Sequence, residues 1–170
     1  MAKTKLVHNY AEKLGIRKKG KVSILGILFL ALIFPPAATY LHEIGHVIAL
    51  KLLGCEAYTP TVYFYFGATP YNCSEPLSPL GWAIAAYAGP FMALLVGLLA
   101  WFYNKDSLLR LFALFLFFYG FLPNLVWQMK GTDAYYAVVH GFSPFYAQII
   151  MYGGLVLVLY LVAKEVMEDE

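Results

Sequence analysis

The sequence predicts an all-α membrane protein with four transmembrane helices and a short membrane-associated β segment between the first and second helices. Two observations predict this fold class. Of the 170 residues, 61% are hydrophobic and only 13% are charged, which leaves too little polar surface for a soluble domain of this length. In addition, residues 80–103, 111–129 and 142–163 contain no charged side chain. Each run meets the length of about 20 residues that spans a bilayer.

The first helix is expected over residues 22–53, an apolar stretch interrupted by Pro35, Pro36 and a polar motif. As one straight helix it would extend roughly 48 Å, which exceeds a hydrocarbon core of about 30 Å. We therefore expect a kink at the proline pair, a strong tilt or a protruding end. The other three helices are expected over residues 80–103, 107–130 and 142–163.

A single transmembrane domain is thus expected over residues 22–163, between a basic arm at residues 1–21 and a polar tail at residues 164–170. The arm is rich in lysine and has no evident signal-peptide cleavage site. We expect it to set the membrane topology or to lie on anionic membrane lipid. A net charge of only +2, with no accompanying nucleic-acid-binding fold, argues against a nucleic-acid partner.

His42-Glu43-Ile44-Gly45-His46 reads H-E-x-x-H and lies inside the first apolar stretch. Residues four apart share one face of a helix, so both imidazoles can bind the same Zn²⁺ ion. Glu43 then lies beside the ion and can take a proton from a zinc-bound water. Placing an ionisable side chain at bilayer depth costs free energy, so three such residues together indicate a functional site. The motif predicts one zinc ion per chain.

A catalytic zinc site needs a third protein ligand, and Asp133 is the favoured candidate. In an up-and-down bundle the first and third helices run in the same direction, so their C-terminal ends lie at the same face of the membrane. Asp133 follows the third apolar run and is expected at a level close to that of the motif. The alternative role for Asp133 is to cap the turn or helix that follows Gly131. His140 is the second candidate ligand.

Small residues recur at every fourth position of the second helix, at Gly81, Ala85, Gly89, Ala93 and Gly97. This spacing allows two helix backbones to approach closely. We expect the stripe to be a packing seam, with the helix that carries the H-E-x-x-H motif as its partner.

Residues 61–66 are β-branched and aromatic and are bounded by Pro60 and Gly67, which predicts a strand or one half of a hairpin. An unpaired strand edge is not tolerated in lipid, so the segment must lie at the interface or pack against protein. Two roles remain open. Its edge could bind an unfolded substrate by strand addition, or its rings could form an aromatic belt at the membrane interface.

The chain resembles the site-2 protease family of intramembrane zinc metalloproteases in four features that follow the family's order. These are the H-E-x-x-H motif on the first core helix, the β region at residues 58–66, Ala88-Gly89-Pro90 as the start of a Gly-Pro-x-x-Asn motif, and Asn124 with Asp133 as the third-helix motif. The resemblance covers residues 22–137. It implies zinc ligands at His42, His46 and Asp133, a catalytic base at Glu43 and a substrate-binding side chain at Asn124.

The chain departs from the family pattern at the residues thought to position the substrate. Ala93 replaces the asparagine of the second motif, Ala134 replaces the glycine after the aspartate, and Asn124 precedes Asp133 by nine residues. The leading expectation is a zinc-dependent intramembrane endopeptidase that cleaves membrane-embedded protein substrates. The alternative is a non-catalytic metal-binding homologue that acts as a structural or interaction subunit. An oligomer or a larger membrane complex remains open.

The charge pattern favours one orientation of this multi-pass protein in the cell membrane or an endomembrane. The basic arm and the connection with Lys105 and Arg110 fall on one side, whereas residues 54–79 contain no lysine or arginine. The positive-inside rule therefore places the N-terminus in the cytoplasm and the zinc site toward the outer face. Cys55 and Cys73 could form a disulfide in that outer loop. The family resemblance implies the opposite orientation, and we favour the charge rule.

Overall fold

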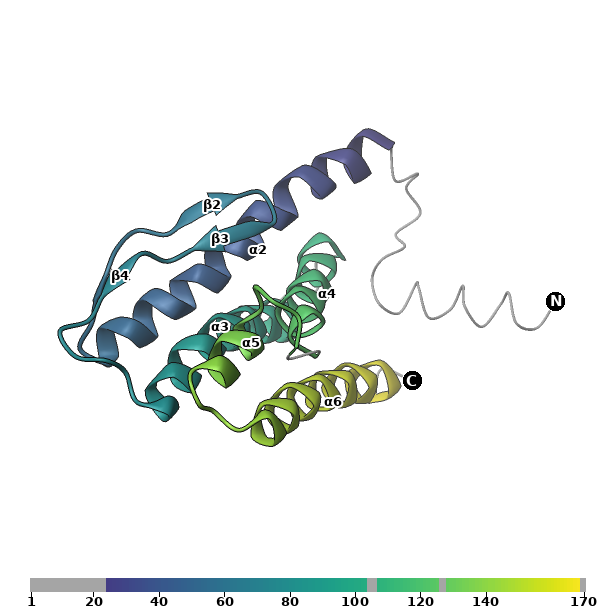
Figure 1. The fold of residues 1–170 in the computed structure, drawn as a ribbon. Helices are drawn as coiled ribbons and strands as arrows, with labels where there is room; N and C mark the ends of the chain where they lie inside the picture. Colours follow the sequence, from purple (N-terminus) through teal and green to yellow (C-terminus); the bar gives the residue numbers. More distant parts are fainter. Residues whose placement is uncertain (1–23, 104–106, 126–127, 169–170) are drawn as a thin grey trace.

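Helices make up most of the computed structural model, which describes residues 24–103, 107–125 and 128–168 (Figure 1). The basic arm expected at residues 1–21 lies outside the described residues. The helices are α2 (Ile24–Leu52), α3 (Pro79–Tyr103), α4 (Ser107–Phe121), the 3₁₀ helix η1 (Pro123–Leu125), α5 (Asp133–Val139) and α6 (Pro144–Glu168). Four short strands lie between α2 and α3, namely β1 (Glu56–Ala57), β2 (Thr61–Tyr63), β3 (Phe66–Ala68) and β4 (Tyr71–Asn72).

The first helix, α2, agrees with the expectation for residues 22–53 at its C-terminal end and runs through Pro35 and Pro36 without interruption. Each proline lacks an N–H, so the carbonyl four residues earlier loses its helical partner. Pro35 is fully buried, as are Ala38 and Thr39 in the next turn. Packing against the other helices therefore stabilises the part of α2 where its own hydrogen bonding is weakest.

Small residues let α2 and α3 approach closely, as the stripe on the second helix predicts. A Cβ added to Gly45 of α2 would overlap the backbone carbonyl of Ala88 in α3, so only glycine fits at this crossing. Ala85 and Ala93 of the stripe are buried. The C-terminal end of the stripe has a different partner, because Gly97 lies against the ring of Phe117 in α4.

The prediction of a third helix over residues 107–130 is wrong in its C-terminal half. α4 ends at Phe121, and the single 3₁₀ turn η1 follows. Pro123 explains the break, because it has no N–H for the helical ladder and its ring disfavours the helical conformation of the residue before it. The chain then turns at Gly131, whose φ of +88° favours glycine. A separate short helix, α5, begins at Asp133.

The β segment lies between the first two long helices, as expected, but residues 61–66 form a turn as well as a strand. β2 pairs with β3 in antiparallel register, with Thr61 opposite Ala68 and Tyr63 opposite Phe66. A second pair, β1 with β4, closes the base of the same loop. Cys55 and Cys73 form a disulfide just outside this second pair. We call the segment from Thr61 to Thr69, which contains β2, β3 and the residue that follows them, the β2–β3 hairpin, and it lies along α2 (Figure 1).

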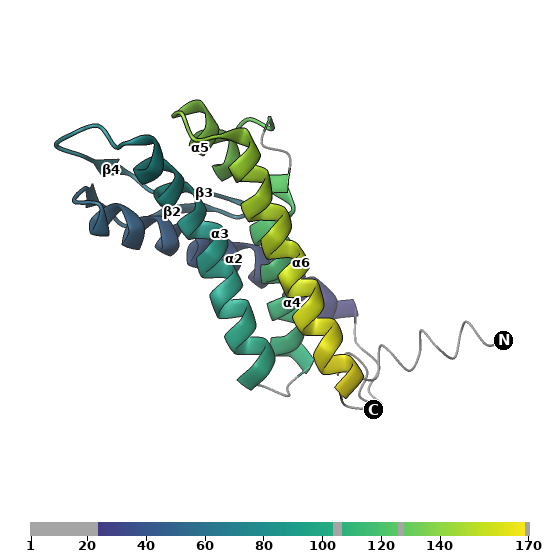
Figure 2. The same ribbon diagram turned by 90° about the horizontal axis from the view of Figure 1, so that it is seen from below.

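Two of the described helices are long and apolar enough to cross a membrane, α3 and the Pro144–Lys164 part of α6. Figure 2 shows α3, α4 and α6 side by side. A shorter apolar helix covers Leu109–Leu125. α6 was expected to end at residue 163 and to be followed by a polar tail. The structure instead continues the helix to Glu168.

Candidate metal centre

His42 and His46 lie one turn apart on α2, with ring centroids 4.8 Å from each other. The two imidazoles are therefore neighbours on one helix face, as the motif predicts. Nδ1 of His46 lies 2.7 Å from the carbonyl oxygen of Ala85 in α3. A carbonyl can only accept, so Nδ1 carries the proton and donates it. This hydrogen bond fixes the orientation of the His46 ring and leaves Nε2 available as a metal ligand.

Asp133 brings a carboxylate to both imidazoles from the start of α5. Its Oδ2 lies 3.1 Å from Nε2 of His42, and its Oδ1 lies 3.3 Å from Nε2 of His46. The alternative role of capping falls to Thr132, whose hydroxyl accepts a hydrogen bond from the backbone N–H of Tyr135. Asp133 is thus the first helical residue after the cap, and its side chain points at the motif.

The Asp133 carboxyl remains ionised although only 19% of its side chain is exposed. Burial by itself favours its neutral form, but the charges of His42 and His46 and their hydrogen bonds outweigh burial and hold its pKa well below the usual range. A carboxylate can bind a metal without first losing a proton, so Asp133 is in the form that a ligand requires.

The three side chains fit a zinc ion in both donor type and spacing. Their ligand atoms all lie within 4.8 Å of one another. In a tetrahedral site with bonds of about 2.1 Å, neighbouring donor atoms are about 3.4 Å apart. The separations of 3.1 and 3.3 Å between the imidazole nitrogens and the Asp133 oxygens are close to that value. Among the described residues, no fourth His, Cys, Asp or Glu joins this group. Three protein ligands with an open fourth position are typical of catalytic zinc sites.

Asn124 supports the third ligand. Its Nδ2 donates to Oδ2 of Asp133 at 3.3 Å and to the carbonyl of Gly120 at 3.1 Å. Its Oδ1 accepts from the backbone N–H of Ala134 at 2.9 Å. Asn124 is buried, and these bonds join the end of α4 to the start of α5. It holds Asp133 in place, and the expected role in binding substrate stays a prediction.

Gly89 of α3 forms the floor of the site. A Cβ at this position would overlap Nε2 of both His42 and His46. Glycine is therefore required at this position by the two histidine rings, in addition to the helix packing that the stripe of small residues provides. Its lack of a side chain leaves the space in which the two ligand nitrogens lie.

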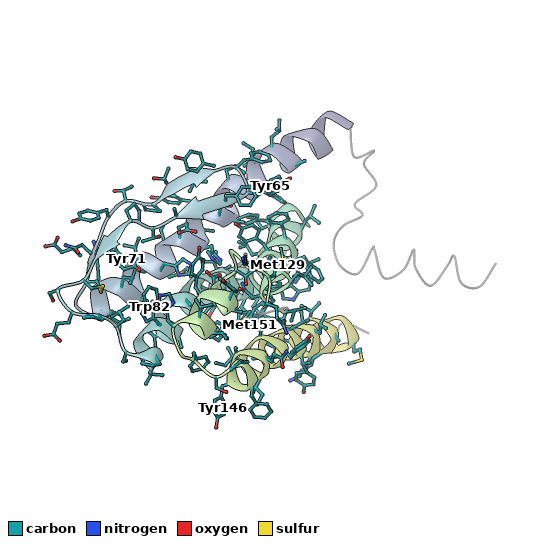
Figure 3. All side chains as sticks on the ribbon, viewed as in Figure 1. Tyr65, Tyr71, Trp82, Met129, Tyr146 and Met151 are labelled. Atoms are coloured by element: carbon teal, nitrogen blue, oxygen red, sulfur yellow. A yellow bond between two sulfur atoms is a disulfide. The ribbon has the colours of Figure 1, made fainter. Side chains whose placement is uncertain are left out.

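Glu43 is buried beside the ligands and lines a cavity of about 790 Å³ together with His42, Asn124 and Asp133. The hairpin forms another wall of this cavity through residues 65–69. Tyr65, Tyr71, Trp82 and Met129 also line it and are labelled in Figure 3. Glu43 and the three candidate ligands therefore face the same cavity.

His140 lies at the C-terminal end of α5 and lines the same cavity, but it does not join the ligand group. Its ring stacks on Trp82 with centroids 3.7 Å apart. Its Nδ1 donates to the carbonyl of Tyr136 at 2.9 Å. The geometry therefore favours Asp133 over His140 as the third ligand.

Sequence reasoning missed two residues that contact Glu43, Thr69 and Gly67. The hydroxyl of Thr69 donates to Oε2 of Glu43 at 2.8 Å. A Cβ on Gly67 would overlap the Glu43 carboxyl group. Both residues follow the aromatic segment that predicted a strand, and neither forms a recognisable motif with Glu43. Only the folding of the hairpin against α2 brings them to it.

Comparison with protein-family models, with curated proteins and with solved structures finds no match for this chain.

The first prediction concerns the ligands. Purified protein binds about one zinc per chain, as a single three-ligand site requires. His46→Ala and Asp133→Ala each lose most of this zinc, because two remaining ligands bind the ion weakly. His140→Ala is the matched control and keeps its zinc. Elemental analysis of the purified variants measures the content. Full occupancy in Asp133→Ala together with loss in His140→Ala would contradict the assignment.

The second prediction concerns Gly89. Gly89→Ala loses zinc although no ligand is changed, because the added methyl group displaces both ligand nitrogens. The side chains of histidine move more easily than backbone, so the helical circular dichroism of the variant remains. Gly153→Ala is the control, since a Cβ there meets nothing within 4 Å. Equal zinc contents in the two variants would show that Gly89 is not the floor of the site.

Proposed function

We propose that this chain is a zinc-dependent intramembrane endopeptidase that hydrolyses peptide bonds of membrane-embedded substrates. The single observation that carries the proposal is the convergence of His42, His46 and Asp133 beside Glu43 in a cavity. Two nitrogen donors and one oxygen donor suit zinc. The order of these residues also resembles that of the site-2 protease family.

Glu43 is proposed as the general base. Bound zinc supplies a Lewis acid that polarises a carbonyl group and lowers the pKa of a water molecule. Glu43 accepts the proton of the attacking water and then donates it to the leaving amine. Its side chain lines the same cavity as the three ligand side chains. Its burial limits competing contacts with bulk water.

The surface of the helices supports a location in the membrane. α6 carries exposed large apolar side chains along its length, including Phe145, Ile149, Val156 and Tyr160. Tyr146 points away from the bundle in Figure 3. An apolar surface of this extent exceeds what soluble monomers usually expose, and lipid is the natural cover for it. Together with α2, α3 and the helix formed by α4 and η1, α6 would complete the four spans expected from the sequence.

The cavity supports an enzyme rather than a purely structural metal site. In a structural site all four coordination positions are filled by protein. Here three ligands face a space that also contains Glu43. A substrate helix hides its amides in its own hydrogen bonds, so it must unwind before cleavage. β3 pairs with β2 alone among the described strands, which leaves an edge on which an unwound segment could pair.

The third prediction tests the chemistry. Glu43→Gln keeps its zinc and its fold, but proteolysis falls by about 10²- to 10⁴-fold, because the change removes the base and retains the ligands. The measurement is cleavage of transmembrane substrates in detergent or liposomes. Glu75→Gln makes the same chemical change at an exposed loop position and leaves the rate unaltered. Unchanged cleavage in Glu43→Gln would contradict the role of Glu43 as the general base. A wild-type protein that binds zinc but cleaves nothing would favour the non-catalytic alternative.

The fourth prediction concerns orientation. The positive-inside rule and the Cys55–Cys73 disulfide both favour an oxidising compartment for the loop that lies beside the zinc site. A cysteine introduced by Glu75→Cys therefore reacts with a membrane-impermeant maleimide in intact cells. One introduced by Lys3→Cys reacts only after lysis. The reverse pattern would give the chain the orientation that the family resemblance implies.

A further inference from the structure

The β2–β3 hairpin touches Glu43 at two points. The Thr69 hydroxyl lies 2.8 Å from the side-chain Oε2 of Glu43 and 3.2 Å from its main-chain oxygen. The hydroxyl has one proton and can donate it to one acceptor at a time. The side-chain oxygen is the nearer of the two acceptors, so it is the better placed partner. Thr69 thus holds one oxygen of a carboxyl group that is otherwise buried.

Gly67 provides the second contact. A Cβ at this position would lie well inside van der Waals contact with the carboxyl group of Glu43. The backbone of Gly67 does not adopt a positive φ, so the glycine is required for space and not for its conformation. The hairpin backbone therefore covers the Glu43 side chain directly.

The tip of the hairpin is fixed to the same face of α2. Thr39 precedes Glu43 by four residues, and its buried hydroxyl donates to the carbonyl of Phe64 at 3.1 Å. The hydroxyl of Tyr119 in α4 lies 2.8 Å from that of Thr39 and 3.2 Å from the carbonyl of Tyr65. Phe64 has a φ of +52°, which is unfavourable for this residue and persists only where surrounding contacts hold it.

We propose that the β2–β3 hairpin sets the position of the catalytic base, with Thr69 as a positioning residue for Glu43. This inference rests on the proposed function. It adds to the catalytic site a positioning residue that lies outside the H-E-x-x-H motif. A carboxylate has about four lone-pair positions, so the Thr69 bond leaves others free to accept a proton. By removing rotamers of Glu43, the bond keeps the base oriented toward the reacting water.

The fifth prediction follows from this role. Thr69→Val keeps the size of the side chain and removes the donor, so kcat falls by about 10- to 100-fold while KM and zinc content stay unchanged. Thr69→Ser restores the donor and most of the rate. Gly67→Ala displaces the carboxyl group and also lowers kcat. Thr59→Val, at an exposed position outside the hairpin, and Gly153→Ala in α6 are matched controls with wild-type rates.

A second measurement needs neither zinc nor activity. The Tm of metal-free protein is compared in a double-mutant cycle of Thr69→Val and Glu43→Met, since methionine has a similar length but no acceptor oxygen. If the two side chains are bonded, Thr69→Val lowers the Tm of the parent and has less than half that effect in the Glu43→Met background. If Thr69 contributes to stability without bonding to Glu43, Thr69→Val lowers the Tm equally in both backgrounds.

The outcomes separate the inference from the proposed function. Wild-type kcat in Thr69→Val, in an enzyme that Glu43→Gln inactivates, overturns the inference alone. Additive Tm losses overturn it as well. If the parent cleaves no membrane substrate, the proposed function fails and the catalytic role of Thr69 fails with it. A fall in kcat that Thr69→Ser reverses, together with coupled Tm values, supports the inference.

Discussion

The pairing of Asp133 with His42 and His46 is the constraint on which the rest of the structure depends. Asp133 lies within hydrogen-bonding range of both histidines among helices with apolar surfaces, where an unpaired ionisable group is costly. The pairing therefore requires the start of α5 to meet the C-terminal half of α2, although the two are far apart in the sequence. The break after α4 and the turn at Gly131 make this meeting geometrically feasible.

Close approach of the backbone is the second requirement, and three glycines satisfy it in different ways. Gly45 lets α2 approach the backbone of α3, Gly89 leaves room for the ligand nitrogens, and Gly67 leaves room for Glu43. Hydrogen bonds then hold the side chains in the space that these glycines leave. The carbonyl of Ala85 orients His46, and Asn124 holds Asp133. His46 and Asp133 are thus each positioned by a residue from another element, a pattern that is common around metal ligands. Nδ1 of His42, by contrast, is buried without a hydrogen-bond partner among the described residues.

Patterns in the sequence were sufficient to predict that Asp133 lies beside His42 and His46 and that Cys55 and Cys73 can pair. They failed where a distant contact or a single residue decides the structure. The apolar run at residues 111–129 predicted an unbroken helix, but Pro123 ends it. α5 was missed because seven residues are too few for a clear periodicity. Thr69 could not be identified as a neighbour of Glu43, since only the docked hairpin brings the two together. The role assigned to Asn124 rested on resemblance, whereas its contacts in the structure are with Asp133 and Ala134.

The central claim is that a zinc ion bound by these three side chains leaves a position open beside Glu43. Anomalous diffraction at the zinc absorption edge, on crystals of the zinc-loaded protein, tests it most directly. The account predicts one peak within about 2.0 to 2.2 Å of Nε2 of His42, Nε2 of His46 and an oxygen of Asp133, with no fourth protein ligand. A peak bound by His140 in place of Asp133, or a fourth protein side chain closing the site, would contradict it.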